Sequence, residues 1–166
     1  MKFKIIGQLL VVIVIVISNA CDNSSLCLSG QNAIQSGLYS ASSDEDKDTT
    51  LSGFYMWGIE HPTDSILLDS VKVSKLYMPT DLNRDSTEFV IREEKLVLGE
   101  VKGVNDTIQF IFKKNLEYVS GDCGFTYNLE IDTVIHTYNL IDSVVISYSS
   151  VVYSENIENV KIYIEP

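Results

Sequence analysis

Apolar side chains recur at every second position in several segments of this chain, and this period predicts β-sheet. Ile108, Phe110 and Phe112 follow it, and so do the four apolar residues from Phe125 to Ile131. Successive side chains of a strand point to opposite faces, so such segments bury one face and expose the other. Val, Ile, Tyr and Phe, which suit a half-buried pleated surface, dominate these segments. Similar segments lie at 71–78, 89–91, 96–101, 144–148, 151–153 and 160–164.

No segment has the 3.6-residue period of an amphipathic helix. About eight short strands, separated by Asp, Asn, Ser and Gly, predict a single antiparallel β-sandwich, immunoglobulin-like in layout. A small β-barrel is the alternative. We expect the sandwich to span residues 37–166. Residues 21–36, rich in Ser, Asn and Gln, are expected to form a polar tether before it.

The first twenty residues have the three parts of a secretory signal peptide. Lys2 and Lys4 are followed by an apolar run over 5–17 and then by Ser18-Asn19-Ala20. A membrane-spanning helix needs about 20 apolar residues, so this run is too short for one. We therefore expect residues 1–20 to be a signal peptide, cut before Cys21. An uncut signal anchor is the alternative.

Cys21 would become the first residue after the cut. Bacterial lipoproteins carry lipid on such a cysteine, after an aliphatic residue three positions earlier and a small residue just before it. Ala20 fits this lipobox, whereas Ser18 departs from it and also fits the small-x-small rule of the ordinary signal peptidase. We expect lipidation of Cys21, which would anchor the protein to a membrane through buried acyl chains.

The chain is acidic. Loss of residues 1–20 would change its formal net charge from −11 to −13. This charge disfavours nucleic acids and anionic lipid head groups as partners. An acidic surface also keeps a protein soluble, so the charge identifies no positive partner.

The two cysteines other than Cys21 are Cys27 and Cys123. An exported protein meets an oxidising compartment, so a Cys27–Cys123 disulfide is expected. A reactive thiol or a metal site is the alternative, but the chain has no C-x-x-C motif.

No motif for catalysis, a metal or a cofactor is present. The chain lacks a G-x-S-x-G motif, a phosphate-binding glycine loop and H-E-x-x-H. The acidic segment 44–48 lacks the glycine and glutamate positions of a calcium loop. His61 and His136 lie apart from residues at zinc-ligand spacing. We expect no catalytic residues, no metal, no cofactor and no enzyme activity.

Trp57 is the only tryptophan, in the segment Phe54-Tyr55-Met56-Trp57. In a strand, Tyr55 and Trp57 share one face. We expect a buried tryptophan in the core. An exposed aromatic platform that binds sugars is the alternative.

Several segments resemble an uncharacterised lipoprotein family of Bacteroidota, and the block ending in Cys123-Gly124-Phe125 is the most specific of them. The resemblance implies an exported lipoprotein with a Cys27–Cys123 link, and it implies no activity. The other similar segments are Cys21-Asp22-Asn23 with Cys27, Gly37-Leu38-Tyr39, 85–91, 106–108 and 158–164.

Aspartate is followed by Ser or Thr and then by an aliphatic residue or Thr more often than expected by chance. Asp and Ser/Thr form turns that lead into strands, which explains the pattern in structural terms. The pattern also resembles the O-glycosylation sequon of Bacteroidota. The seven positions are Asp48, Asp64, Asp69, Asp85, Asp106, Asp132 and Asp142.

These observations predict a non-enzymatic lipoprotein, a binding or structural module of the cell envelope. Its expected partners are the membrane, through a lipid on Cys21, and an envelope protein or a glycan. We expect the outer membrane rather than the inner one. The alternative is an accessory sugar- or peptide-binding subunit of an outer-membrane uptake assembly.

Overall fold

The computed structural model of the protein describes residues 32–43, 45–59, 66–152 and 157–165. Within these ranges the chain forms ten strands and no helix. The strands are β1 (Ala33–Ser40), β2 (Leu51–Gly58), β3 (Ile66–Val73), β4 (Lys75–Pro79), β5 (Ser86–Val97), β6 (Glu100–Ser120), β7 (Gly124–His136), β8 (Ile141–Ile146), β9 (Ser150–Val151) and β10 (Val160–Ile164).

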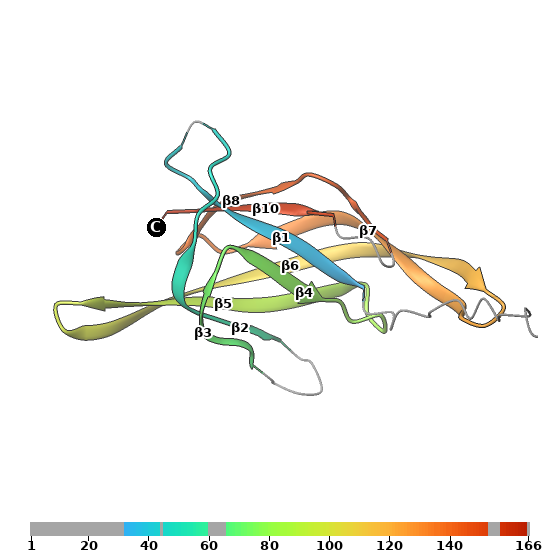
Figure 1. Ribbon diagram of the computed structural model, residues 1–166, viewed down its shortest axis with the longest axis horizontal. Coiled ribbons are helices and arrows are strands. Elements are labelled where there is room, and N and C mark those ends of the chain that lie inside the picture. The colour runs from blue at the N-terminus through green and yellow to red at the C-terminus, as the bar shows by residue number, and fades with distance from the viewer. Residues whose placement is uncertain (1–31, 44, 60–65, 153–156, 166) are drawn as a thin grey trace, which may run out of the picture.

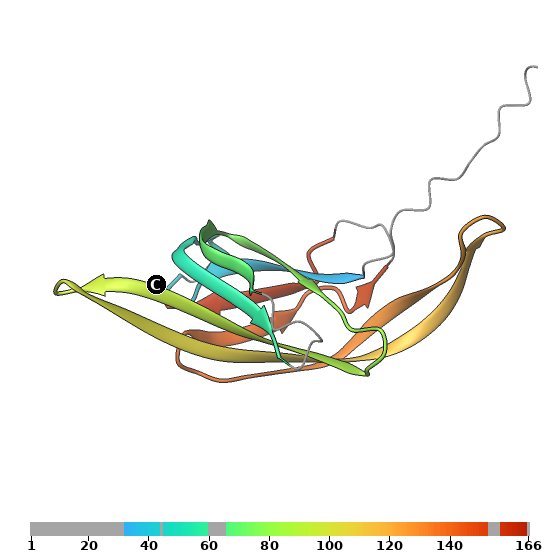
Figure 2. The same cartoon turned by 90° about the horizontal axis from the view of Figure 1, so that it is seen from below.

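The strands form two sheets, with orders β4-β1-β10-β8 and β3-β2-β5-β6-β7-β9. All strand pairs are antiparallel except β1 with β10, which run parallel. The predicted all-β sandwich is confirmed, and the two sheets do not close into the alternative barrel. The four-stranded sheet covers the middle of the six-stranded sheet (Figures 1 and 2).

The core lies between the sheets and follows the two-residue period. Burial alternates along β10 and along the middle of β5 and β6. The largest fully buried side chains come from both sheets and are Phe54, Phe89, Phe110, Ile34, Leu38, Leu51, Met56, Met78, Ile91, Ile108, Leu129 and Ile141. Burial of these apolar surfaces is the main stabilising contribution to the fold.

Two boundaries differ from those expected from the sequence. Strand β1 begins at Ala33, within the range 21–36 expected to form the tether. The segment 96–101 was expected to be one strand, but the chain reverses there between β5 and β6. The alternation is the same on both sides of this turn, so the period alone does not mark the reversal.

Strand β6 has 21 residues, which corresponds to roughly 70 Å if it were straight. Its two ends form the β5–β6 and β6–β7 hairpins, which extend beyond the four-stranded sheet in opposite directions (Figures 1 and 2). The long sheet therefore presents a separate tip at each end of the molecule.

Candidate interaction surfaces

The β5–β6 hairpin ends in a two-residue turn. Val97 pairs with Glu100, and Leu98 and Gly99 between them have φ angles of 54° and 83°. Positive φ at both central residues is the geometry of a type I′ turn, which favours Asn-Gly. Leucine in this conformation costs about 1 kcal/mol or more. Leu98 is also 99 % exposed, so no buried contact compensates for the strain.

Further apolar side chains surround this turn. Leu96 and Val101 lie directly opposite each other, and both are exposed. Val97, beside the turn, is exposed as well. We call this apolar end, residues 96–101, the leucine tip. It is a contiguous exposed apolar surface on an acidic protein, and this makes it a candidate for contact with a partner.

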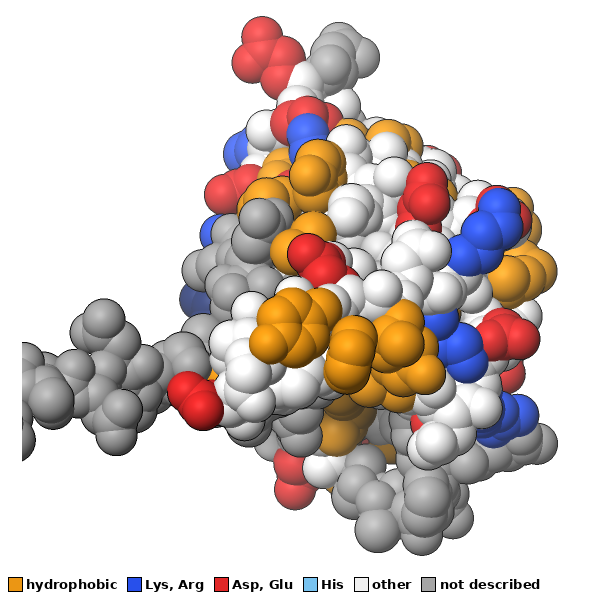
Figure 3. All heavy atoms as spheres, turned by 90° about the vertical axis from the view of Figure 1, so that its right-hand side faces the viewer, with side chains coloured by type: hydrophobic (Ala, Val, Ile, Leu, Met, Phe, Trp, Pro, Cys, Tyr) orange, Lys and Arg blue, Asp and Glu red, His pale blue; other side chains and the backbone are white. Residues whose placement is uncertain are grey.

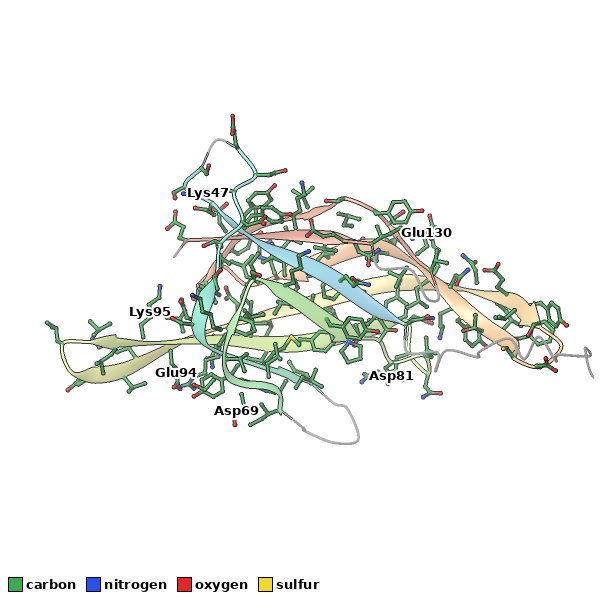
Figure 4. The ribbon with its side chains drawn as sticks, viewed as in Figure 1. Lys47, Asp69, Asp81, Glu94, Lys95 and Glu130 are labelled. Atoms are coloured by element: carbon green, nitrogen blue, oxygen red, sulfur yellow. The ribbon has the colours of Figure 1, made fainter. Side chains whose placement is uncertain are left out.

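The stem below the leucine tip is held by polar contacts. Arg92 Nη2 lies 2.7 Å from Glu94 Oε1, and the Tyr55 hydroxyl donates a hydrogen bond to Glu94 Oε2 at 3.2 Å. The Arg92 guanidinium lies over Gly103, where a Cβ would be 2.5 Å from Nη2. Glu94 and Lys95 point to opposite sides of β5 (Figure 4). These contacts stabilise the two strands that carry the leucine tip.

The β6–β7 hairpin is amphipathic. Leu116 pairs with Tyr127 and Tyr118 with Phe125, so these four side chains share one face, which we call the aromatic face. The rings of Tyr118 and Phe125 meet edge-to-face with centroids 5.3 Å apart, and Phe125 is 66 % exposed. Figure 3 looks at this end of the molecule and shows hydrophobic side chains gathered there.

The start of the described chain lies against this hairpin. The side-chain amide of Asn32 donates a hydrogen bond to the Tyr127 carbonyl oxygen. Asn32 is almost fully buried, and β1 begins at the next residue. The segment before residue 32 therefore joins the domain at the base of the aromatic face, at the end opposite the leucine tip.

A polar cluster lies on the outer face of the four-stranded sheet. Asp46 accepts hydrogen bonds from Lys161 and Tyr163, and these contacts lower its pKa. Burial, followed by a hydrogen bond to Glu158, raises the pKa of Tyr39 to about 12. Both features hold the groups in their ordinary charge states at neutral pH. The cluster therefore fixes the 45–48 loop to β10.

Beside this cluster is a hollow of about 330 Å³. Gly37 lies next to it, and a Cβ there would be 2.3 Å from Glu158 Oε2, so glycine lets Glu158 reach over β1. Gly37 pairs with Lys75, and Gln35 pairs with Tyr77. The hollow thus combines a cation, an anion, an amide and an aromatic ring. Its lining residues are Gln35, Ser36, Lys75, Leu76, Tyr77 and Glu158.

Asp106 is a buried carboxylate that joins the two sheets. It lies on β6 and is 1 % exposed. It accepts hydrogen bonds from the backbone N–H groups of Asn139, Leu140 and Ile141, the residues that lead into β8. The Thr137 hydroxyl also donates to it. Burial raises the pKa of Asp106, but the hydrogen bonds from Thr137 and the three backbone groups outweigh it and lower the pKa. This aspartate of an Asp-Thr-aliphatic pattern therefore has a structural function.

The predicted site residues are only partly within the described ranges. Cys21, Cys27 and His61 lie outside them. Cys123 lies in the turn between β6 and β7, where its N–H donates to Ser120 Oγ at 3.1 Å. His136 ends β7 and contacts the ring of Tyr138.

The described residues contain no group of three or more His, Cys, Asp and Glu side chains that could hold a metal ion. Over the same ranges, no helix has the length and apolar character to cross a bilayer.

Trp57 is not in the core, contrary to expectation. It is half-buried and lies outside the core cluster. Phe54 and Met56 occupy the core face of β2, so the two-residue period places Trp57 with Tyr55 on the outer face. The sequence does not tell which of the two faces of this strand is buried. Only the strands that pack against Phe54 and Met56 identify their side as the core side.

The leucine tip and the aromatic face were not identified from the sequence. Their apolar residues continue the alternation of the buried strands, so the sequence pattern assigns these residues to the core. The signal for the tip is the Leu98-Gly99 pair between two alternating runs, a glycine position that suits a hairpin turn.

Comparison with known proteins gives one family. The model of a family of unknown function, DUF6452, matches residues 53–164, which is more than half of the chain. No curated protein and no solved structure shows a significant match.

Proposed function

Because the chain belongs to the DUF6452 family, whose function is unknown, we propose its function from its own residues. We propose that it is an exported, lipid-anchored module of the cell envelope that has no catalytic activity. Through the leucine tip it binds another envelope protein.

The observation that carries the proposal is Leu98. An exposed leucine at positive φ is unfavourable both for the turn and for solvation, while Asn would suit the same position. Features that break a local rule without a structural gain are expected at functional sites. Leu96 and Val101 add apolar surface, and the tip offers few polar groups for a sugar. An apolar pocket on a protein is the partner that suits this tip.

The N-terminal sequence supports export and anchoring. The leader over 1–20 predicts secretion, and Cys21 follows it directly. An exported chain meets an oxidising compartment, and on this ground we propose that Cys27 and Cys123 form a disulfide. The chain enters the domain beside Tyr127, so an anchor at Cys21 would leave the leucine tip facing away from the membrane. We place the anchor in the outer membrane.

The anchor is tested by the intact mass of protein purified from membranes of its native host, with and without reductant. We expect a chain that starts at Cys21, carries acyl groups and gains the mass of two hydrogens on reduction. A soluble product with an unmodified Cys21 would overturn the lipid anchor.

The binding site is tested by a photo-crosslinking amino acid placed at Leu98 in the native host. Val145, an exposed residue of β8, is the matched control position. We expect a discrete adduct with an envelope protein from position 98 and none from position 145. Leu96→Asp should weaken the adduct without changing the fold measured by circular dichroism. Equal adducts at both positions, or an adduct of two copies of this chain, would contradict the proposal.

A second candidate function is favoured by the hollow beside Gly37. Its lining of Gln35, Lys75, Tyr77 and Glu158 has the mixture of hydrogen-bonding groups and an aromatic ring that suits a sugar or a short peptide. In this case the protein would be an accessory subunit of an outer-membrane uptake assembly.

Calorimetric titration with envelope oligosaccharides and peptides tests the second candidate. Binding that Lys75→Ala abolishes and Lys47→Ala preserves would support it. Absence of binding by the unaltered protein would reject it.

A further inference from the structure

The aromatic face is an exposed apolar surface at one end of the long sheet. Its four apolar side chains come from directly opposite positions of β6 and β7. Apart from Val119, the reverse side of the hairpin is polar, and the Asn128 side chain donates a hydrogen bond to Glu117 there. Tyr118 and Phe125 are both more than half exposed. Aromatic rings on one face and polar groups on the other suit the boundary between lipid head groups and acyl chains.

The point at which the described chain begins bears on what this face contacts. The Asn32 side chain donates a hydrogen bond to the backbone carbonyl of Tyr127, whose ring belongs to the aromatic face. Cys21 lies eleven residues before Asn32, so the intervening chain reaches at most about 40 Å. A lipid on Cys21 would therefore be attached much nearer to this hairpin than to the leucine tip.

Tethering strengthens a weak surface contact. A tethered surface meets the bilayer at a high effective concentration, so a few aromatic side chains are sufficient for contact. Firm membrane attachment commonly combines a lipid with a second contact. The net negative charge of the protein gives no attraction to anionic head groups, so the apolar face has to supply this second contact.

We propose that Leu116, Tyr118, Phe125 and Tyr127 dock onto the lipid bilayer that holds the anchor. This inference rests on the proposed lipid at Cys21 and goes beyond it. The anchored domain then contacts the membrane through its β6–β7 hairpin, and the leucine tip points away from the membrane. Docking restricts the orientation of the domain, which a flexible tether by itself does not.

The test uses tryptophan fluorescence of the mature, membrane-purified protein in vesicles of phosphatidylethanolamine and phosphatidylglycerol. In a Trp57→Phe background, Phe125→Trp reports on the aromatic face and Leu98→Trp reports on the opposite tip. Lipids brominated along their acyl chains quench only an indole that enters the bilayer. We expect strong quenching with a blue shift at position 125 and none at position 98. Circular dichroism checks that both variants fold.

The outcomes separate the docking from the anchor. Acyl mass on Cys21 with no quenching at position 125 would overturn the docking and leave the anchor in place. Equal quenching at positions 98 and 125 would overturn the proposed orientation. A blue shift that depends on protein concentration but not on vesicles would assign the face to a second copy of the chain. Absence of acyl mass would overturn the anchor and, with it, the docking.

Discussion

The Asp106 carboxylate accepts a hydrogen bond from the backbone N–H of Ile141 at 2.7 Å, and this contact joins β6 of one sheet to β8 of the other. The same carboxylate also accepts hydrogen bonds from the backbone N–H groups of Asn139 and Leu140. Three backbone donors where the chain enters β8 therefore depend on one side chain. The sandwich is therefore held at this end by charge-assisted hydrogen bonds as well as by apolar packing.

Asp106→Ala should destabilise the fold by about 3 kcal/mol or more, because it leaves the buried N–H groups of Leu140 and Ile141 without their acceptor. Urea denaturation of both proteins measures the difference. Asp142→Ala is the control, because that side chain is exposed and is expected to change stability by less than about 0.5 kcal/mol. Similar losses in the two variants would contradict the assigned function of Asp106.

The pH dependence of stability should change when Asp106 is replaced. Its pKa in the fold is lowered below the ordinary value of 3.8, so the unfolded chain binds this proton more tightly. Its contribution is therefore complete above that value and is lost as the pH falls through the lowered pKa. The stability difference between the protein and Asp106→Asn should be constant near neutral pH and narrow in acid. Denaturation at a series of pH values checks this, and a constant difference throughout would refute it.

Gly53→Ala should destabilise the protein by about 2 kcal/mol or more, because Gly53 has φ 65° and a Cβ would lie 2.6 Å from the Glu94 carbonyl oxygen. Gly103→Ala is the matched variant. There the added methyl meets the end of the Arg92 side chain, which is able to move away. We expect a smaller loss of about 1 kcal/mol in urea denaturation. A larger loss of stability for Gly103→Ala than for Gly53→Ala would contradict the conclusion that the backbone contact at Gly53 requires glycine.

Leu98→Asn should stabilise the protein by about 0.5–1 kcal/mol while it weakens the contact with the partner. Asn suits the first position of a type I′ turn, and leucine does not. Leu96→Asn, at an exposed strand position, should give no gain in stability. Thermal unfolding measures the stability, and a photo-crosslinking amino acid placed at Val101, since position 98 is changed here, measures the contact. If the variant is more stable but its adduct is unchanged, Leu98 strains the turn without contributing to binding, which would contradict the proposed contact.

Cys27→Ser and Cys123→Ser should destabilise the protein equally. The expected loop of 97 residues corresponds to about 4–5 kcal/mol in the chain-entropy model. Urea denaturation without reductant measures both losses, and Cys21→Ser should cause none. A loss for Cys123→Ser but not for Cys27→Ser would assign a different partner to Cys123.

The fold class was accessible from the sequence, whereas the candidate surfaces were not. Phe110 and Ile162 lie in runs with a large apolar residue at every second position, and this pattern predicted the buried faces of two strands that the structure contains. Leu96 and Phe125 follow the same pattern and are exposed. The strands that carry them extend beyond the sheet that would cover them, and alternation contains no information about that overlap.

Local chemistry determined what the sequence alone could establish about this protein. A two-residue period is a property of the extended backbone itself, so the all-β sandwich followed from the order of apolar residues. Burial, strain and contacts between distant residues depend on how the two sheets overlap, so only the tertiary structure decided them. It placed Trp57 outside the core, buried Asp106 between the sheets and left Leu98 exposed at the end of a long hairpin.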